Sequence, residues 1–222
     1  MNEIKVVLFD LDGTLIDTLE DLGDAVNHAL ERRGFPLHTR EEYRRMVGHG
    51  IRNLVRKALP DGMRDQIPVV EECLADFRSW YSAHIDVHTR PYPGIPALLS
   101  DLDAAGICLA VASNKFQEGT EQLIREFFPD IRFAAILGNR EGFPLKPDPQ
   151  IVEEVLRASA MPREAAIMVG DSPTDMLTAA NGGIRSLAVT WGYRTPEELS
   201  GAEQVRTVEE LRNRLLPAFV GR

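Results

Sequence analysis

Val6-Val7-Leu8-Phe9-Asp10-Leu11-Asp12-Gly13-Thr14 is the stretch of sequence that decides the fold of this chain. Four consecutive apolar residues predict a strand that is buried on both faces, and the run stops at two aspartates one residue apart. Two carboxylates this close repel each other unless a cation or a shared proton compensates. A carboxylate pair and a glycine turn at the carboxyl end of a strand therefore indicate a divalent metal site that contains a nucleophile.

Short apolar runs alternate with helical patterns along the rest of the chain. The apolar runs predict strands, and the stretches between the later runs predict helices. This alternation indicates an α/β fold, a Rossmann-like parallel sheet with helices on both faces. The predicted strands are residues 6–9, 107–112, 133–137, 167–169 and 187–189, and the predicted helices are residues 95–105, 119–127, 150–158 and 174–181.

The interval of residues 17–88 breaks this pattern because it contains helical patterns but no good strand. Apolar residues recur at helical spacing in residues 19–30, Thr39-Arg40-Glu41-Glu42 fits a capping box, and residues 69–81 predict another helix. Roughly 70 residues of helix are too many for one crossover, so we expect an all-helical cap over the carboxyl ends of the strands. The predicted domains are an α/β core of residues 1–16 and 89–222 and a cap of residues 17–88.

The composition limits the classes of function. The 222 residues are 44% hydrophobic and 27% charged, as in a globular protein with a sizeable core. The formal net charge of −9 argues against a nucleic-acid partner, although a local cation still allows an anionic substrate. We expect no membrane partner and a cytoplasmic location, since there is no run of about 20 apolar residues and no signal-peptide core. The sequence leaves the oligomeric state, monomer or homodimer, open.

Polar motifs follow four of the predicted strands, and parallel strands bring such motifs to one edge of the sheet. Acids with a divalent ion, together with donors for a tetrahedral anion, are what phosphoryl transfer requires. The motifs are Asp10-Leu11-Asp12, Ser113-Asn114-Lys115, Lys146-Pro147-Asp148-Pro149 and Gly170-Asp171-Ser172-Pro173-Thr174-Asp175.

In this order, the four motifs resemble those of the haloacid dehalogenase-like hydrolase superfamily, and the helical insertion is similar to the cap of that family. The resemblance implies that Asp10 is the nucleophile, which forms an aspartyl-phosphate, and that Asp12 is the general acid and base. True dehalogenases lack the second aspartate, so Asp12 favours the phosphatase branch. The resemblance further implies that Mg²⁺ is bound by Asp10, Asp12, Asp171 and Asp175, and that Lys146 compensates negative charge. It also implies that the substrate is bound by Thr14, Ser113, Asn114 and Lys115. For Lys115, an exposed lysine outside the site fits the sequence equally well.

The cap contains a glycine-flanked segment, Gly48-His49-Gly50-Ile51-Arg52. It resembles the glycine-rich cap segment of phosphoglycolate phosphatases, and its glycines permit a tight turn into a cleft. We expect His49, Gly50 and Arg52 to contact the substrate, although a plain helix–helix connection fits equally well. The segment Trp191-Gly192-Tyr193, after the last predicted strand, also resembles the corresponding segment of phosphoglycolate phosphatases. The alternative is that it only packs at the edge of the sheet.

These features predict a Mg²⁺-dependent phosphatase for a small phosphorylated metabolite, with 2-phosphoglycolate as the leading candidate. The same core would serve a phosphomutase of the β-phosphoglucomutase type, a pyrophosphatase or a nucleotidase. A different class is a non-catalytic protein that binds a phosphorylated metabolite. The presence of a nucleophile, an acid–base aspartate, a lysine and a metal-binding acid argues against that class.

Overall fold

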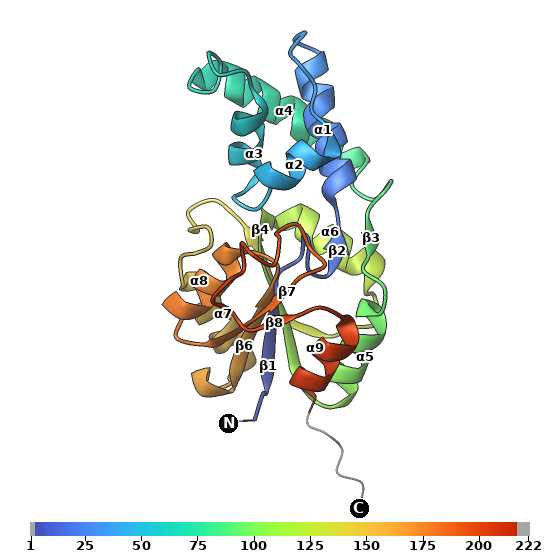
Figure 1. Cartoon of the computed structure of the whole chain (residues 1–222), viewed down its shortest axis with the longest axis vertical. Coiled ribbons are helices and arrows are strands. Elements are labelled where there is room, and N and C mark those ends of the chain that lie inside the picture. Colours follow the sequence, from blue (N-terminus) through green and yellow to red (C-terminus); the bar gives the residue numbers. More distant parts are fainter. Residues whose placement is uncertain (1–2, 217–222) are drawn as a thin grey trace, which may run out of the picture.

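A computed structural model describes residues 3–216 and contains a six-stranded parallel sheet (Figure 1). The strand order is β5-β4-β1-β6-β7-β8, so the chain extends the sheet in one direction from β1 and then in the other. This is the predicted Rossmann-like arrangement, in which ligands bind where the strand order reverses. The strands are β1 (Val6–Phe9), β4 (Cys108–Phe116), β5 (Phe133–Asn139), β6 (Ala166–Gly170), β7 (Arg185–Val189) and β8 (Gln204–Val205).

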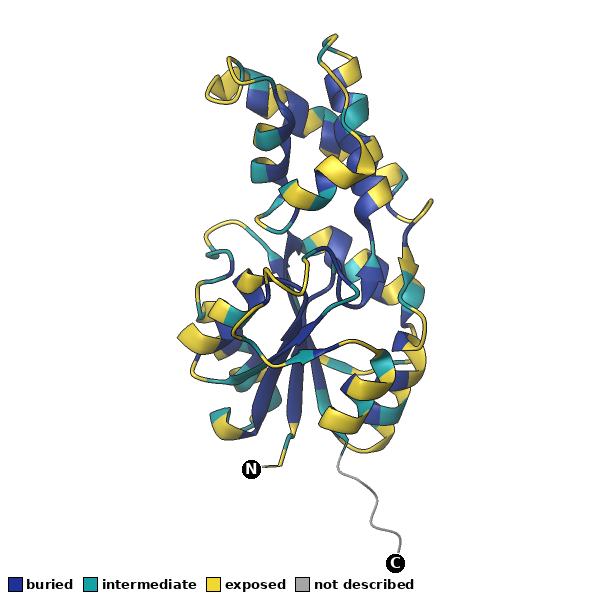
Figure 2. Ribbon diagram, in the orientation of Figure 1, coloured by how far each residue is buried: buried dark blue, intermediate teal, exposed yellow. Residues whose placement is uncertain are grey.

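Helices cover both faces of the sheet, which is dark with buried residues in Figure 2. Successive side chains of a strand point to opposite faces, so Val7 and Phe9 of β1 join one apolar core and Val6 and Leu8 join the other. The first core also contains residues of α5 (Ile95–Ala104), α6 (Gln117–Phe127) and α9 (Val208–Leu215), and the second contains residues of α7 (Gln150–Ser159) and α8 (Pro173–Asn181).

The helical insertion packs as a group beyond the carboxyl ends of the strands, at the top of Figure 1. Its second helix begins with the predicted capping box: Thr39 N donates to Glu42 Oε2 at 2.7 Å, and Glu42 N donates to Thr39 Oγ1 at 3.4 Å. The helices of the insertion are α1 (Leu19–Glu31), α2 (Arg40–Met46), α3 (Ile51–Ala58) and α4 (Ile67–Ala83).

A two-stranded ribbon connects the insertion to the sheet. Strands β2 (Ile16–Asp17) and β3 (Arg90–Pro91) pair antiparallel, with Ile16 opposite Pro91. The sequence does not predict these strands, because two-residue strands carry no periodic signal. The division into a core of residues 1–16 and 89–222 and a cap of residues 17–88 stays a prediction, and residues 1–2 and 217–222 of that core lie outside the described residues.

Besides the two ribbon strands and the 3₁₀ helix Arg163–Ala165, three elements lie outside the sequence prediction. Helix α3 has only eight residues and begins within the glycine-flanked segment, directly after Gly50. Strand β8 has two residues, and α9 follows it with eight. Each is too short for hydrophobic periodicity to stand out from its surroundings. Within residues 3–216, no helix combines the length and apolar character needed to cross a membrane.

Candidate active site

The acids at the centre of the site lie at the ends of the two neighbouring strands where the strand order reverses. Asp10 directly follows β1, and Asp171 directly follows β6. Carboxylate oxygens of Asp10, Asp171 and Asp175 all lie within 4.8 Å of one another. The structure therefore brings together three of the acids that the sequence places in separate motifs.

Lys146 is the cation of this acidic cluster. Its Nζ lies 2.9 Å from Asp10 Oδ1 and 2.7 Å from Asp175 Oδ1, and it also donates to the carbonyl oxygen of Ala112 at 2.8 Å. Burial alone lowers the pKa of Lys146, but the two carboxylates outweigh burial and hold that pKa above its ordinary value. The lysine is therefore an ammonium shared between two acids.

One ammonium does not neutralise three carboxylates. Burial raises the pKa of Asp10 to about 7, although Lys146 opposes the rise, and the charge of Asp175 adds to it. Burial also raises the pKa of Asp171, and the charges of Asp175 and Asp10 raise it further. The cluster therefore favours a bound cation, or protons, at neutral pH.

Two glycines make room for the Asp171 carboxylate. A Cβ atom on Gly13 would lie 2.4 Å from Asp171 Oδ2, and so would a Cβ atom on Gly192. The same carboxylate oxygen accepts a hydrogen bond of 2.6 Å from the backbone N–H of Tyr193. The loop after β1 and the loop after β7 therefore meet at Asp171, and the Trp191-Gly192-Tyr193 segment belongs to the site rather than only to the sheet edge.

The Asp12 carboxylate is held by a separate network. Its Oδ1 accepts hydrogen bonds from Thr18 Oγ1 at 2.7 Å and from Lys115 Nζ at 3.3 Å. The backbone N–H of Thr18 donates to Tyr193 Oη at 2.8 Å, and Lys115 Nζ lies 2.6 Å from Tyr81 Oη on α4. Lys115 is buried, which rules out the alternative of an exposed lysine. Two aspartates one residue apart thus have different neighbours.

The two polar residues that precede Lys115 in β4 differ in what they offer a ligand. Ser113 Oγ accepts from the backbone N–H of Lys115 at 3.2 Å, and its own proton has no acceptor in residues 3–216. The Asn114 side-chain amide instead donates to the carbonyl oxygens of Gly48 and Lys146, both at 3.2 Å, and accepts from Lys146 N at 2.8 Å. Both Asn114 amide hydrogens thus have protein acceptors, so this side chain connects two loops at the pocket lining, and its contact with the substrate stays a prediction.

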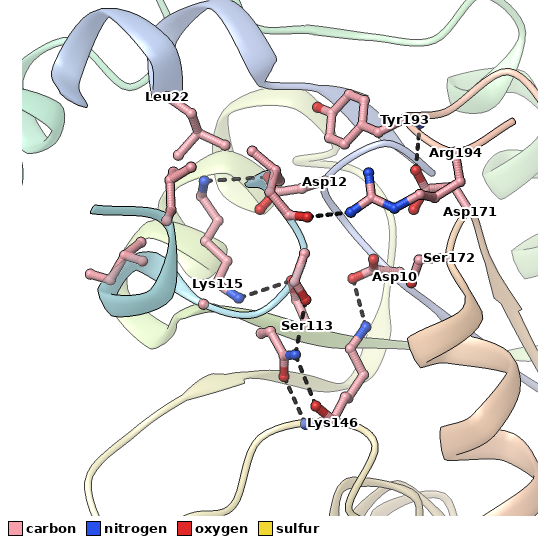
Figure 3. Close-up of a pocket in the computed structure, with 16 residues that line it drawn as sticks. Asp10, Asp12, Leu22, Ser113, Lys115, Lys146, Asp171, Ser172, Tyr193 and Arg194 are labelled. Carbon is pink, nitrogen blue, oxygen red and sulfur yellow. Dashed lines mark hydrogen bonds and ion pairs between the residues drawn. The ribbon is translucent and has the colours of Figure 1, made fainter. Parts of the chain in front are cut away.

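A pocket of about 40 Å³ lies between the core and the cap and is lined by these polar residues (Figure 3). One water needs roughly 10–15 Å³ of such volume, so the pocket suits a compact ligand. Its cap side is mostly apolar, and the Arg194 guanidinium points into it from the loop after β7. The apolar lining comes from Leu22, Val47, Ile51 and Leu54.

Only one of the three cap residues that were predicted to contact the substrate lines the pocket. Gly50 lines it, but His49 and Arg52 do not belong to the lining. Gly50 is the residue before α3, so Arg52 lies on a helix rather than on the predicted loop, and its half-exposed side chain pairs with Glu71. The structure therefore places Arg52 on α3 and outside the pocket lining, and its contact with the substrate stays a prediction.

Two further predicted residues lie behind the pocket. Thr14 is fully buried, is absent from the lining, and has a hydroxyl without a hydrogen-bond partner among the described residues. Asp175 is also fully buried, where its Oδ2 accepts from the Ser172 backbone N–H at 3.1 Å and from Ser172 Oγ at 2.6 Å. Asp175 therefore contacts Lys146 and its own helix start rather than the pocket itself.

Sequence reasoning missed Thr18, Tyr81 and Arg194. Arg194 directly follows the Trp191-Gly192-Tyr193 segment, so its position after the strand β7 is a usable signal. Tyr81 is one of several aromatic residues on an amphipathic helix, and nothing in that pattern separates it from an ordinary core residue. Its place beside Lys115 depends on how the cap docks, which the sequence does not specify.

Comparison with known proteins gives the same result as the motifs. Residues 7–189 match the family described as haloacid dehalogenase-like hydrolase. The chain is 36% identical to the phosphoglycolate phosphatase of Mesorhizobium japonicum over 85% of this chain and 83% of that protein, and 34% identical to phosphoglycolate phosphatase 1 of Pseudomonas aeruginosa over 96% and 79%. The chain therefore belongs to the haloacid dehalogenase-like hydrolase family.

The fold comparison agrees. A crystal structure from Lactobacillus delbrueckii subsp. bulgaricus, of a protein provisionally named a phosphoglycolate phosphatase, matches with a TM-score of 0.91 and 32% sequence identity. The match covers 97% of this chain and 100% of that one, so it includes both the sheet and the helical insertion.

Proposed function

We propose that this chain is a Mg²⁺-dependent phosphatase that hydrolyses 2-phosphoglycolate or a similarly compact phosphorylated acid. The observation that carries the proposal is the pair of aspartates with different surroundings. Asp10 is paired with Lys146 beside further acids, whereas Asp12 is held by Thr18 and Lys115. These different surroundings support Asp10 as the carboxylate that attacks phosphorus and Asp12 as the one that transfers a proton. The two relatives named phosphoglycolate phosphatase support the substrate.

The reaction proceeds in two steps on these residues. A carboxylate oxygen of Asp10 attacks the phosphorus, Asp12 gives its proton to the departing oxygen, and an aspartyl-phosphate and an alcohol form. Water then attacks the phosphorus while Asp12 takes a proton, which releases inorganic phosphate and restores both side chains. The Ser113 hydroxyl donates to a phosphoryl oxygen, and Lys146 compensates the charge beside Asp10.

The donor set fits Mg²⁺, because three carboxylates within 4.8 Å of one another share a single ammonium and all the ligands are oxygens. Asp10, Asp171 and the backbone carbonyl of Asp12 would hold the ion. Asp175, which already contacts Lys146 and Ser172, would orient them. When bound, the ion neutralises negative charge on the carboxylates and on the phosphoryl group.

Arg194 supports a substrate that carries a second acidic group. Its guanidinium lines the pocket and donates to the backbone carbonyls of Arg44, at 2.6 Å, and Val47, yet it forms no ion pair with any described carboxylate. A guanidinium has five N–H donors, so some remain for a carboxylate of the ligand.

The test is a substrate panel with the purified protein in MgCl₂ or EDTA. Release of inorganic phosphate is followed for 2-phosphoglycolate, p-nitrophenyl phosphate, pyrophosphate and nucleoside monophosphates. We expect the highest kcat/KM for 2-phosphoglycolate and no turnover in EDTA. Isomerisation of β-glucose 1-phosphate without phosphate release would instead indicate a phosphomutase, and binding without turnover would indicate a non-catalytic protein. A cytoplasmic location stays a prediction, and the oligomeric state stays open.

A further inference from the structure

Tyr81 brings a hydroxyl from the cap to a lysine of the core. It lies near the end of α4, is fully buried, and its Oη lies 2.6 Å from Lys115 Nζ. Its ring stacks on Phe77, with centroids 5.2 Å apart, and meets Phe116 edge-on at 6.0 Å. The apolar contacts of the ring account for its packing, but they do not account for a hydroxyl placed on a buried ammonium.

Lys115 depends on this hydroxyl because it has few other partners. Only 3% of the residue is exposed, and the side-chain partners of Nζ within residues 3–216 are Tyr81 Oη and Asp12 Oδ1. Loss of the hydroxyl would leave a buried charged donor short of an acceptor, and such a donor moves toward another partner.

Hydrogen bonds to only one carboxylate oxygen set the orientation of the Asp12 side chain. Thr18 and Lys115 both donate to Oδ1, at 2.7 Å and 3.3 Å, and Oδ2 receives no hydrogen bond from the described residues. The carboxylate is therefore fixed through one oxygen, and the other is left to carry the proton. A general acid must point at the atom that it protonates, so this fixed orientation affects rate directly.

We propose that Tyr81 is a positioning residue: from the cap, it holds Lys115 against Asp12 and so orients the proton-carrying oxygen of Asp12 toward the substrate. Because Tyr81 is on the cap and Lys115 and Asp12 are on the core, the contact exists only while the cap lies on the core. Docking of the cap and alignment of the acid are thus the same event. This inference rests on the proposed function, since it takes Asp12 to be the group that transfers the proton.

Tyr81→Phe is the test, because it removes one oxygen and keeps the stacked ring. We expect kcat for 2-phosphoglycolate to fall roughly tenfold, the effect of losing one hydrogen bond to a charged group, while KM stays within about twofold. Lys115→Met should lower kcat by more than Tyr81→Phe does. In the Lys115→Met background, Tyr81→Phe should have no further effect, because the hydroxyl acts only through the lysine. Lys115→Gln replaces Lys115→Met if the latter does not fold.

Tyr43→Phe is the matched control. Tyr43 is also buried in the cap, and its hydroxyl donates to Asn27 Oδ1 at 2.7 Å, so the same atom is lost from the same part of the molecule. We expect Tyr43→Phe to leave kcat unchanged. An equal fall in kcat for Tyr43→Phe, a normal kcat for Tyr81→Phe, or a fall that persists without Lys115 would each overturn the inference.

Asp12→Asn separates this inference from the proposed function. If Asp12→Asn retains wild-type turnover, the acid–base role itself is wrong and the proposed function fails. If Asp12→Asn loses turnover while Tyr81→Phe does not, the proposed function stands and only the role of Tyr81 fails. If Asp12→Asn and Tyr81→Phe both lower kcat, and Tyr81→Phe has no further effect in the Lys115→Met background, the proposed function and the role of Tyr81 are both supported.

Discussion

Asp10 and Asp12 are one residue apart in the chain, and their neighbours give them different chemistry. Asp10 sits beside Lys146 and other carboxylates, and burial, with the charge of Asp175 added and that of Lys146 opposing, raises its pKa to about 7. Asp12 instead receives two hydrogen bonds on a single oxygen. Gly13, which directly follows Asp12, has a positive φ of 87°, and this conformation lets the chain reverse soon after the strand.

Asp10→Asn tests the nucleophile. The change keeps the shape of the side chain but replaces a carboxylate by an amide, which is a poor nucleophile, so we expect kcat to fall by roughly a thousandfold or more. Phosphate release measures the effect. Asp148→Asn is the control, because Asp148 is exposed near Lys146 and does not line the pocket. Near-normal turnover in Asp10→Asn would refute the assignment.

Arg194→Met tests recognition of the substrate's acidic group. We expect kcat/KM for 2-phosphoglycolate to fall at least tenfold further than kcat/KM for ethyl phosphate, which lacks a carboxylate, since about 1.4 kcal/mol of lost ion pairing corresponds to a factor of ten. The ratio of the two substrates is the measurement, so any general effect of a loosened cap cancels. Arg45→Met, at an exposed arginine of α2, should leave the ratio unchanged.

At the scale of helices and strands, the sequence predicts best where one local signal is enough. The end of β1 at Asp10 and the capping box at Thr39 depend on residues a few positions apart, and both are confirmed. Arg52 was misplaced because Gly48 and Gly50 resemble a loop, whereas the structure begins α3 directly after them. Tyr81 could not be identified, because its partner Lys115 is 34 residues away and belongs to another part of the molecule.

Thr39→Ala tests the contribution of the capping box at α2. The change removes the hydroxyl that accepts from the backbone N–H of Glu42, so we expect the free energy of unfolding to fall by about 1 kcal/mol. Urea unfolding followed by circular dichroism gives this value. Since Thr39 is exposed and lies outside the pocket lining, kcat should not change, and a loss of turnover at unchanged stability would contradict this account.

At the scale of the whole molecule, the buried acidic cluster links stability to pH and to metal. The pKa of Asp10 rises from an ordinary 3.8 to about 7, and the pKa of Asp171 also rises. At pH values between the ordinary and the raised pKa, the folded protein holds protons that the unfolded chain has already released. As pH rises through this range, Asp10 and Asp171 therefore make the metal-free protein less stable. A cation that binds the ionised carboxylates reverses this loss.

Excess MgCl₂ should therefore raise the Tm more at about pH 8 than at about pH 5.5, because protons compete with the ion at the lower pH. Thermal unfolding with MgCl₂ or EDTA at both pH values is the measurement. Asp171→Asn should lose most of the difference, while Asp148→Asn should keep it. An equal rise in Tm at both pH values would show that these acids are not the ones that bind the ion.

The paired strands β2 and β3 make the insertion exchangeable. The chain leaves the sheet at Ile16 and returns at Pro91, and these residues face each other in one antiparallel pair. Adjacent strands lie only about 4.8 Å apart, so a few residues would bridge the gap if the helices were deleted, and helices from another protein would need only two neighbouring ends to be joined. Chimeric enzymes are thus feasible in which the reacting carboxylates stay in place while a transplanted lid changes which phosphate ester is accepted.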